Sequence, residues 1–446
     1  MPTMSTLDRK IWGIAWPAIL SNISVPILGL VDAAILGHLG DARYLGSVAL
    51  GTAILSFLYW GFSFLRMGTT GLVARATGAG DHDSAFMVLA QSMVLALGLA
   101  GAVILLHPLW LGLGFSLMDP QPALLPLAQS YAGIRIASAP AVLITYAIIG
   151  WFIGRQNTRW PMLIMILTNA ANIVLDFIFI VGLGLNSDGA AIATVIAEYL
   201  GLALALLVVA RQVPATAWST ARQRIADWPA YARLLRSNRH LFVRTVCLLA
   251  SFAFFTAMGD KLGADTLAAN ALLIQLLMLA AFGLDGFAFA AEGLAGSALG
   301  AGNLGAFHRA VRRCAIWCFG TAALVSIAYW LLNPLLFPVL TDLDPVRQIM
   351  FDQVPWLIAL PLLAAPSYLL DGVFIGSAET RPMMITMLAS ALLVYLPLWY
   401  VTQPLGNDGL WLAFCAFNAA RGLSLWLWYL YLNRSDRWLA VGSGAH

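Results

Sequence analysis

Charged residues are scarce in this chain. Asp, Glu, Lys and Arg make up only 10% of its 446 residues, whereas 61% are hydrophobic. Apolar runs close to the roughly 20 residues needed to cross a bilayer recur along the whole length. The composition therefore predicts an all-α polytopic membrane protein. The net charge of +3 does not indicate a partner, because in a membrane protein the position of the positive residues matters more than their sum.

Reactive cysteine and histidine patterns are also missing. The four cysteines lie in or beside apolar runs and form no Cys-x-x-Cys pair, which favours packing roles over a disulfide or metal framework. The six histidines form no His-Glu-x-x-His motif, and no Gly-x-Ser-x-Gly elbow occurs. A Gly-x-Gly-x-x-Gly match at 300–305 follows an expected membrane helix, so we interpret it as a loop. We expect no enzyme activity, no cofactor, no metal and no nucleic-acid partner.

Twelve apolar segments are long enough to span a membrane, six in each half of the chain. They lie near 12–37, 45–70, 86–107, 124–150, 161–184, 188–210, 240–259, 266–295, 310–332, 350–376, 382–402 and 408–432. The most polar stretch between them, 211–239, is expected to be a basic cytoplasmic linker. It joins an N-terminal six-helix lobe at 1–210 to a C-terminal six-helix lobe at 240–446.

The two halves repeat each other at an offset of 222 residues. Identical residues at this offset include Gly71 and Gly293, Gly78 and Gly300, Gly150 and Gly372, Gly154 and Gly376, and Arg159 and Arg381. Because matching blocks lie far apart along the chain, the duplicated unit is half the protein rather than a short motif. An apolar chain of two duplicated halves is typical of transporters that rock one helix bundle against another.

Positive charge is distributed unevenly between the two sets of loops. If the linker is cytoplasmic, seventeen Lys and Arg residues fall on the inner side and only three on the outer side. This bias predicts that both termini are cytoplasmic. Since each half has an even number of spans, both halves have the same orientation, and their pseudo-twofold axis lies along the membrane normal.

Charged residues inside the spans are candidate functional residues, since each is costly in hydrocarbon. They are Asp32, Arg66, Arg135, Asp176, Glu198, Asp285, Glu292, Asp371 and Arg421. The aspartates do not repeat at the 222-residue offset, which predicts coupling chemistry in one half only. Glu198, Asp285, Glu292, Asp371 and Arg421 also fit helix-end charges or ion pairs, and Arg66 fits a side chain that snorkels to the inner surface.

The sharpest polar pattern lies in the first half. Asn169, Asn172 and Asp176 share one face of the fifth span, and Ala190, Thr194 and Glu198 share one face of the sixth. Asp32 follows Pro26, which leaves the carbonyl of Asn22 without its helical partner, so the first helix is expected to bend there. Two carboxylates close together in a low-dielectric site favour taking up one proton or holding a cation.

The same residues could instead have a structural role. Asn and Thr side chains form hydrogen bonds between membrane helices, and the aspartates could pair with Arg66 or Arg135. The combination of Asp32, Asp176 and Asn172 with a proline hinge favours the functional interpretation.

The chain resembles the multidrug and toxic compound extrusion (MATE) family, in its DNA-damage-inducible protein F branch. The likeness runs from about Leu7 to Leu432 and rests on four segments. They are Asn22-Ile-Ser-Val-Pro26-Ile-Leu-Gly-Leu-Val-Asp32, Leu65-Arg-Met-Gly-Thr-Thr-Gly71, Asn172-Ile-Val-Leu-Asp176 and Leu284-Asp-Gly-Phe287. The resemblance implies two pseudo-symmetric six-helix lobes around a central cleft.

The resemblance also implies a mechanism. The expected function is secondary active export of lipophilic, cationic or aromatic toxic compounds in exchange for protons, or alternatively for sodium ions. The coupling site falls on Asp32, Asn172, Asp176 and Thr194, with the backbone carbonyl of Ala190. In the second half Asp371 fits a tenth-span aspartate of the family, but the expected seventh-span glutamate is missing. Apolar and aromatic side chains suit a promiscuous cleft, and the candidates are Met67, Tyr146, Phe152, Phe287 and Phe289.

Two further expectations concern an alternative substrate class, and the oligomeric state and membrane in which the protein acts. A flippase for a lipid-linked or amphipathic substrate is the alternative function, and it would need a basic cavity, for which Arg66 and Arg135 are available. We expect a monomer in the lipid bilayer of the inner or plasma membrane, with small-molecule drugs as its partners.

Overall fold

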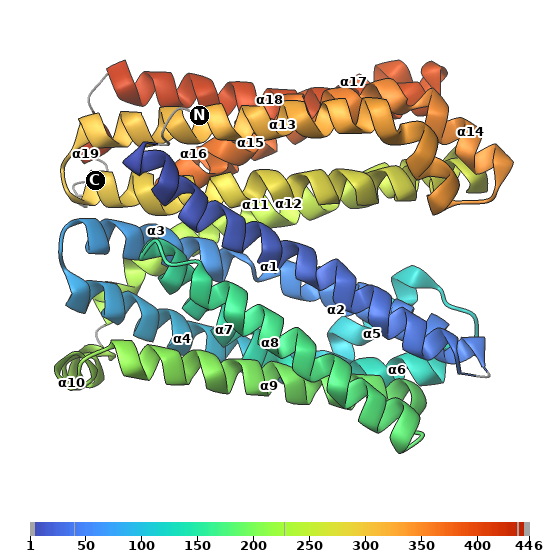
Figure 1. The fold of residues 1–446 in the computed structure, drawn as a ribbon, viewed down its shortest axis with the longest axis horizontal. Coiled ribbons are helices and arrows are strands. Elements are labelled where there is room, and N and C mark those ends of the chain that lie inside the picture. Colours follow the sequence, from blue (N-terminus) through green and yellow to red (C-terminus); the bar gives the residue numbers. More distant parts are fainter. Residues whose placement is uncertain (1–4, 40, 227, 435–436, 441–446) are drawn as a thin grey trace. The chain divides into compact units, whose positions relative to one another are not determined.

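The computed structural model describes residues 5–39, 41–226, 228–434 and 437–440. All regular elements among these residues are helical (Figure 1). Twelve helices or continuous helix pairs are long and apolar enough to cross a membrane, which confirms the predicted all-α polytopic fold. Their bounds follow the predicted segments, with the largest extensions at Ala42–Gly78, Tyr231–Lys261 and Leu304–Leu340.

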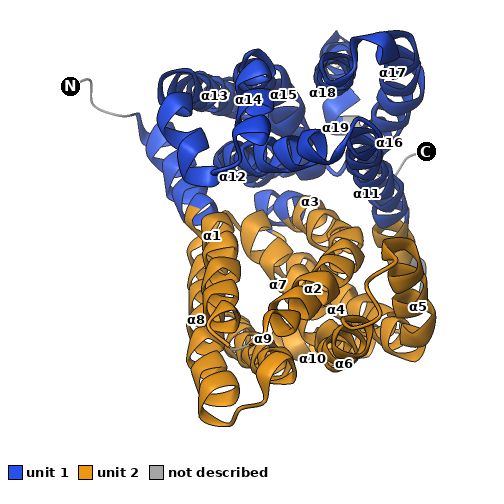
Figure 2. Cartoon of the chain, turned by 90° about the vertical axis from the view of Figure 1, so that its right-hand side faces the viewer, with its two compact units in different colours: residues 1–19, 74–80, 236–446 blue, residues 20–73, 81–235 orange. Residues whose placement is uncertain are grey.

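The helices form two compact units, coloured separately in Figure 2. One unit comprises Leu20–Val73 and Asp81–Leu235. Its elements are most of α1 (Thr6–Gly37), α2 (Ala42–Gly61) and α3 (Phe64–Gly78), then α4 (His82–Leu105), α5 (His107–Met118), α6 (Leu125–Arg135), η1 (Ile136–Ser138), α7 (Ala139–Gly154), α8 (Arg159–Asp176), η2 (Phe177–Gly182), α9 (Asn186–Gln212), α10 (Ala215–Arg224) and the start of α11 (Trp228–Lys261). We call it the α8 unit.

The other unit comprises Met1–Ile19, Ala74–Gly80 and Arg236–His446. Its further elements are α12 (Ala264–Gly300), α13 (Leu304–Leu340), α14 (Asp344–Asp352), α15 (Val354–Gly376), α16 (Thr380–Ala389), η3 (Ser390–Tyr395), α17 (Leu396–Thr402), η4 (Gln403–Leu405), α18 (Asn407–Arg434) and α19 (Arg437–Ala440). We call it the α15 unit.

The units differ from the predicted lobes of 1–210 and 240–446 at three places. The start of α1 and the end of α3 belong to the α15 unit because they pack against α12. A Cβ on Gly286 would lie 2.8 Å from the carbonyl oxygen of Ala15, and Trp12 meets Phe287 edge to face at 5.3 Å. The stretch predicted as the linker, 211–239, contains the end of α9, all of α10 and the start of α11, and the boundary between the two units falls within it, between Leu235 and Arg236.

The 222-residue repeat extends to the backbone. Positive φ angles recur at Gly80 and Gly302, at Gln156 and Ala378, and at Gly184 and Gly406. Helix starts repeat too. The side chain of Asp81 accepts a hydrogen bond from the backbone N–H of Ser84, and that of Asn303 accepts one from Ala306, which caps α4 and α13.

The repeated glycines mark equivalent helix crossings. A Cβ on Gly150 would lie 2.4 Å from the carbonyl oxygen of Arg66, and a Cβ on Gly372 would lie 2.4 Å from that of Ala288, 222 residues further on. The same holds for Gly154 against Thr70, at 2.8 Å, and for Gly376 against Glu292, at 2.3 Å. Small residues let membrane helices approach backbone to backbone, so these glycines set the packing of α3 on α7 and of α12 on α15.

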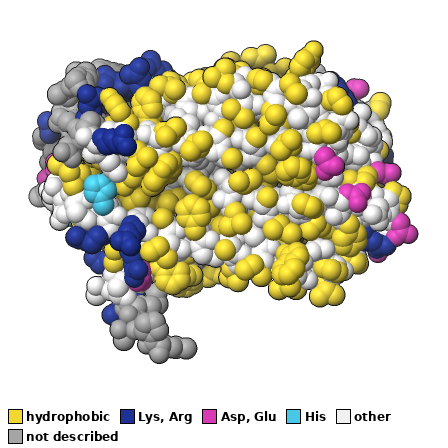
Figure 3. All heavy atoms as spheres, turned by 90° about the horizontal axis from the view of Figure 1, so that it is seen from above, with side chains coloured by type: hydrophobic (Ala, Val, Ile, Leu, Met, Phe, Trp, Pro, Cys, Tyr) yellow, Lys and Arg dark blue, Asp and Glu magenta, His cyan; other side chains and the backbone are white. Residues whose placement is uncertain are grey.

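The surface agrees with a membrane setting. On the face seen in Figure 3, hydrophobic side chains cover the middle, whereas Lys and Arg side chains gather toward one end. Many large apolar residues of the helices are exposed, among them Leu30, Trp60, Leu97 and Trp330. In water such a surface would aggregate, but in lipid it contacts the acyl chains.

Candidate functional site

The predicted polar face of the fifth span points inward in the α8 unit. The buried residues of α8 include Asn169, Asn172 and Asp176, and Asp176 has no exposed surface. The spacing of 3 and 4 residues places these side chains on one helical stripe, as expected. Immediately after Asp176 the helix changes to the π-helical segment η2, a distortion that often accompanies functional sites.

Asp32 lies beside this stripe. The carboxyl groups of Asp32 and Asp176 are close enough to interact, and the guanidinium of Arg135 acts electrostatically on both. Oδ1 of Asp32, both carboxyl oxygens of Asp176 and both amide atoms of Asn172 are buried, and as long as both carboxyls are ionised none of these atoms has a hydrogen-bond partner among the described residues. The two carboxyls lie within hydrogen-bonding reach of each other, and they can form that bond only when one of them is protonated. The fold therefore gathers five desolvated polar atoms from α1 and α8.

The other two residues of the predicted coupling site, Thr194 and Ala190, have hydrogen-bond partners, and so does the neighbouring Asn169. The hydroxyl of Thr194 on α9 donates to the carbonyl of Ala190, at 2.9 Å, so the two groups are hydrogen-bonded to each other. Asn169 donates to the hydroxyl of Ser24 at 3.0 Å, which ties α8 to α1 just before Pro26.

Arg135 forms its ion pair with Glu198 rather than with either aspartate. Its Nη1 lies 3.1 Å from Oε1 of Glu198, and both side chains are largely shielded from solvent. The backbone carbonyl of Arg135 also accepts a hydrogen bond from the hydroxyl of Tyr59, at 3.3 Å. The pair links α6 to α9 and holds one positive group near the two aspartates.

The five predicted cleft residues fall into two groups. Phe152 and Phe287 have no exposed surface and pack in the cores of their own units. Met67, Tyr146 and Phe289 are half-buried, as is Arg66.

The α15 unit contains a second charged cluster, which we call the arginine pair. Arg244 on α11 and Arg421 on α18 both donate to Oδ2 of Asp371 on α15, the latter at 3.1 Å. The sequence predicted Asp371 and Arg421 as charged residues inside the spans but not Arg244, although Arg244 is a lone charge inside the seventh span. Of the remaining predicted charges, Glu292 is buried, Asp285 is half-buried, and both have interaction partners.

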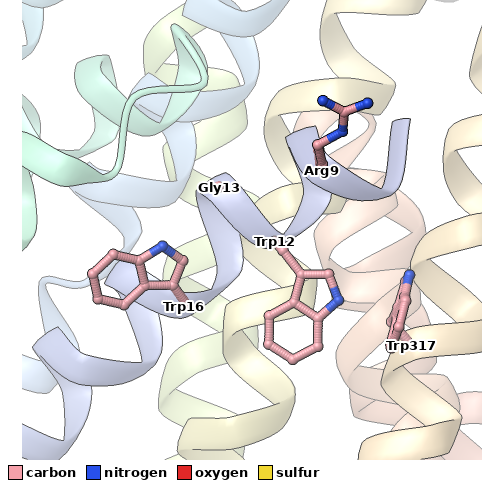
Figure 4. A pocket seen from close by; sticks show the side chains of 5 residues that line it. All are labelled: Arg9, Trp12, Gly13, Trp16 and Trp317. Atoms are coloured by element: carbon pink, nitrogen blue, oxygen red, sulfur yellow. The ribbon is translucent and has the colours of Figure 1, made fainter. Parts of the chain in front are cut away.

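A shallow hollow of 470 Å³ lies at the start of α1 (Figure 4). Arg9, Trp12, Gly13, Trp16 and Trp317 line it, and Trp12 meets Trp317 edge to face at 5.2 Å. Asp8 accepts a hydrogen bond from the indole of Trp317 at 3.0 Å and pairs with Arg313. Tryptophans beside basic residues are typical of the boundary between lipid and water, so this region anchors α1 against α13.

The family model MatE matches residues 17–178 and 241–401, and the chain belongs to this family. It is a multi-pass membrane transporter of the multidrug and toxic compound efflux class, not an enzyme. The DNA damage-inducible protein F of Escherichia coli is 38% identical, over 99% of this chain and 96% of that protein. The probable multidrug resistance protein NorM of Geobacillus kaustophilus is 25% identical over 59% of this chain and 58% of that protein.

Solved structures share the fold. The Vibrio cholerae MATE transporter VcmN in the bent form superposes with a TM-score of 0.85 at 22% identity, covering 97% of this chain and 98% of that one. A MOP superfamily transporter from Pyrococcus furiosus gives a TM-score of 0.86 at 21% identity, covering 97% of both chains. For that transporter, the reverse polarity of its binding pocket suggests a different function.

Proposed function

We propose that the chain is a proton-coupled antiporter, with sodium as the alternative ion, and that Asp32 and Asp176 bind the coupling ion. The observation that carries the proposal is the set of unpaired atoms on Asp32, Asn172 and Asp176. An unpaired buried carboxylate is costly, and two of them close together repel each other. A proton shared by the pair, or a cation held by the oxygens with Thr194 and the Ala190 carbonyl, would remove both costs.

The proposed conformational change takes place in α1. In this structure α1 is one continuous helix from Thr6 to Gly37 that contains Pro26, and Asn169 holds the segment just before the proline through Ser24. Proline removes one backbone hydrogen bond and weakens the helix locally. Protonation of Asp32 would change its interaction with Asp176, so that α1 bends at Pro26, the substrate pocket closes and the drug leaves.

The proposed substrates are lipophilic cationic or aromatic compounds. The half-buried Met67, Tyr146 and Phe289 are the side chains we assign to the cleft, with Phe152 and Phe287 supporting them. Flexible Met and flat aromatic surfaces adapt to many ligands. We further propose that the protein acts as a monomer in the inner membrane with both termini cytoplasmic, as the excess of Arg on one set of loops supports.

The test is dye efflux from proteoliposomes that carry wild type, Asp32→Asn or Asp176→Asn, under an imposed pH gradient and separately under a sodium gradient. We expect each variant to lose at least about tenfold of its pH-driven efflux, since it removes the group that exchanges the proton. Asp342→Asn is the control, because Asp342 is exposed in the loop before α14.

The outcomes separate the coupling ions. Loss of a sodium-driven rather than a pH-driven signal would assign sodium. Undiminished efflux from both variants would contradict a coupling site in the α8 unit and direct the search to Asp285, Glu292 and Asp371.

A further inference from the structure

The arginine pair in the α15 unit has more positive charge than its partner neutralises. The side chains of Arg244 and Arg421 are each only 6% exposed, and both bind the same oxygen of Asp371, whose side chain is 11% exposed. Three helices, α11, α15 and α18, each contribute one residue. A structural ion pair between two helices needs one cation for one carboxylate, so the second guanidinium requires another explanation.

One donor of the arginine pair has no hydrogen-bond partner among the described residues. Each guanidinium has five N–H groups. Besides the bonds to Asp371, Arg421 donates to the amide oxygen of Asn418 at 3.3 Å, whereas the buried Nε of Arg244 has no partner among the described residues. Leaving a desolvated cationic donor unpaired is costly. An anion between the two arginines would satisfy it.

Aromatic rings hold one member of the arginine pair, Arg421, in place. The guanidinium of Arg421 lies over the ring of Phe417, 5.5 Å from its centroid, and Phe417 stacks on Tyr395 at 5.2 Å. Tyr368, one turn before Asp371 on α15, is within electrostatic reach of both arginines and of Asp285. A guanidinium whose position is fixed by stacking on a ring is suited to binding carboxylates, sulfonates and phosphates, because it offers two parallel N–H groups to a planar or tetrahedral anion.

We propose that Arg244 and Arg421 bind the anionic group of a transported substrate, so that the substrates include aromatic anions. This inference rests on the proposed transport function and names a substrate class for it. Asp371 acts as the internal counter-ion when no substrate is bound, and the substrate anion replaces it on one of the arginines. The acidic coupling site in the α8 unit remains separate from this basic subsite.

The test compares two dyes with the same xanthene ring and opposite charge, the anionic fluorescein and a cationic rhodamine ester. Efflux of each is measured in proteoliposomes carrying wild type, Arg244→Gln or Asp371→Asn, at matched expression and with thermal stability recorded. For Arg244→Gln we expect at least about a tenfold loss of kcat/KM for fluorescein and less than about a twofold change for rhodamine, since one charge-assisted bond is worth about that factor.

Asp371→Asn should change the apparent affinity for fluorescein in the opposite direction to Arg244→Gln. Because it removes the competing carboxylate, we expect the KM for fluorescein to fall while that for rhodamine does not. A purely structural ion pair predicts instead that both variants lose both activities and thermal stability together, and that outcome would overturn the proposal. Arg347→Gln is the matched control, since Arg347 forms an ion pair with Asp344 outside the cluster.

A binding measurement on the wild type needs no variant. Fluorescein anisotropy with purified protein should rise on binding and fall on addition of benzoate but not of benzylammonium. Competition by benzylammonium alone would contradict an anion subsite. If wild type exports rhodamine but not fluorescein, the subsite proposal fails and the transport proposal stands. If it exports neither dye, the transport function itself fails.

Discussion

At the scale of single residues, the carboxyl of Glu379 has a raised pKa. It lies between α15 and α16, half-buried, and burial raises the pKa of its carboxyl to about 7, although Arg75 and Arg381 oppose the shift. Nearby, Arg75 donates to the carbonyl of Ser377 at 2.9 Å. A folded-state pKa above the unfolded value means that the folded state binds the proton more tightly, so stability falls as pH rises through about 7.

We therefore predict that Glu379→Gln makes the protein more stable at pH 8 and nearly unchanged at pH 5. The gain should be about 2 kcal/mol once solvent screening of the half-buried group is allowed for. Thermal unfolding in detergent at both pH values measures it. Asp81→Asn is the contrast: hydrogen bonds from Ser84 lower the pKa of Asp81, and because pH 5 and pH 8 both lie above that pKa, the substitution should destabilise the protein equally at the two pH values. A gain for Glu379→Gln that is equal at both pH values would contradict the assignment.

Residue spacing along the chain predicted part of the site and missed part. Asn172 and Asp176 were predictable as one face because helical periodicity alone places them together. The pairing of Arg135 with Glu198 was not, since it depends on how α6 packs against α9. Arg244 was not predicted, because only the fold brings it against Asp371, 127 residues away in sequence.

At the scale of helices, the repeated glycines control the packing. We predict that Gly372→Ala destabilises the protein by about 2 kcal/mol, because the new methyl group would lie 2.4 Å from the backbone oxygen of Ala288, which cannot rotate away. Gly320→Ala is the control, since a Cβ there meets no atom within 4 Å and alanine favours the helix. Thermal unfolding of both variants measures the difference, and equal stability would show that α12 and α15 tolerate separation.

The ends of the helices were less predictable than their number. Hydrophobic length alone identified twelve spans, but not the break between α2 and α3 near Phe62, nor the π-helical segments η2 and η3. These features arise from local hydrogen-bond choices that hydropathy does not encode. The predicted linker at 211–239 contains the end of α9, all of α10 (Ala215–Arg224) and the start of α11. These helices form because the residues of α10 and of the start of α11 have ordinary helix-forming sequences.

In the whole molecule, the residues that set helix packing are duplicated, whereas the charged residues of the two proposed sites are not. Glycine contacts, helix caps and positive φ angles recur at 222 residues, whereas Asp32, Asp176, Arg244 and Asp371 do not have charged equivalents. The duplicated helix packing was therefore predictable from the 222-residue repeat in the sequence. The two proposed sites could differ in charge because nothing in the helix packing requires the buried polar residues to match.

The repeat also makes a prediction about orientation. Asp119 and Asp342 occupy nearly equivalent positions in the two halves, after α5 and after α13. Six spans per half predict that both lie on the same side of the membrane, and seventeen Lys and Arg residues in one set of loops against three in the other predict that this side is the outer one. In a background without the four native cysteines, Asp119→Cys and Asp342→Cys should react with a membrane-impermeant maleimide in intact cells, whereas Arg222→Cys should react only after permeabilisation. Halves of opposite orientation would instead label one of the two aspartate positions and not the other, and such a protein could not rock two like-oriented bundles around an axis along the membrane normal.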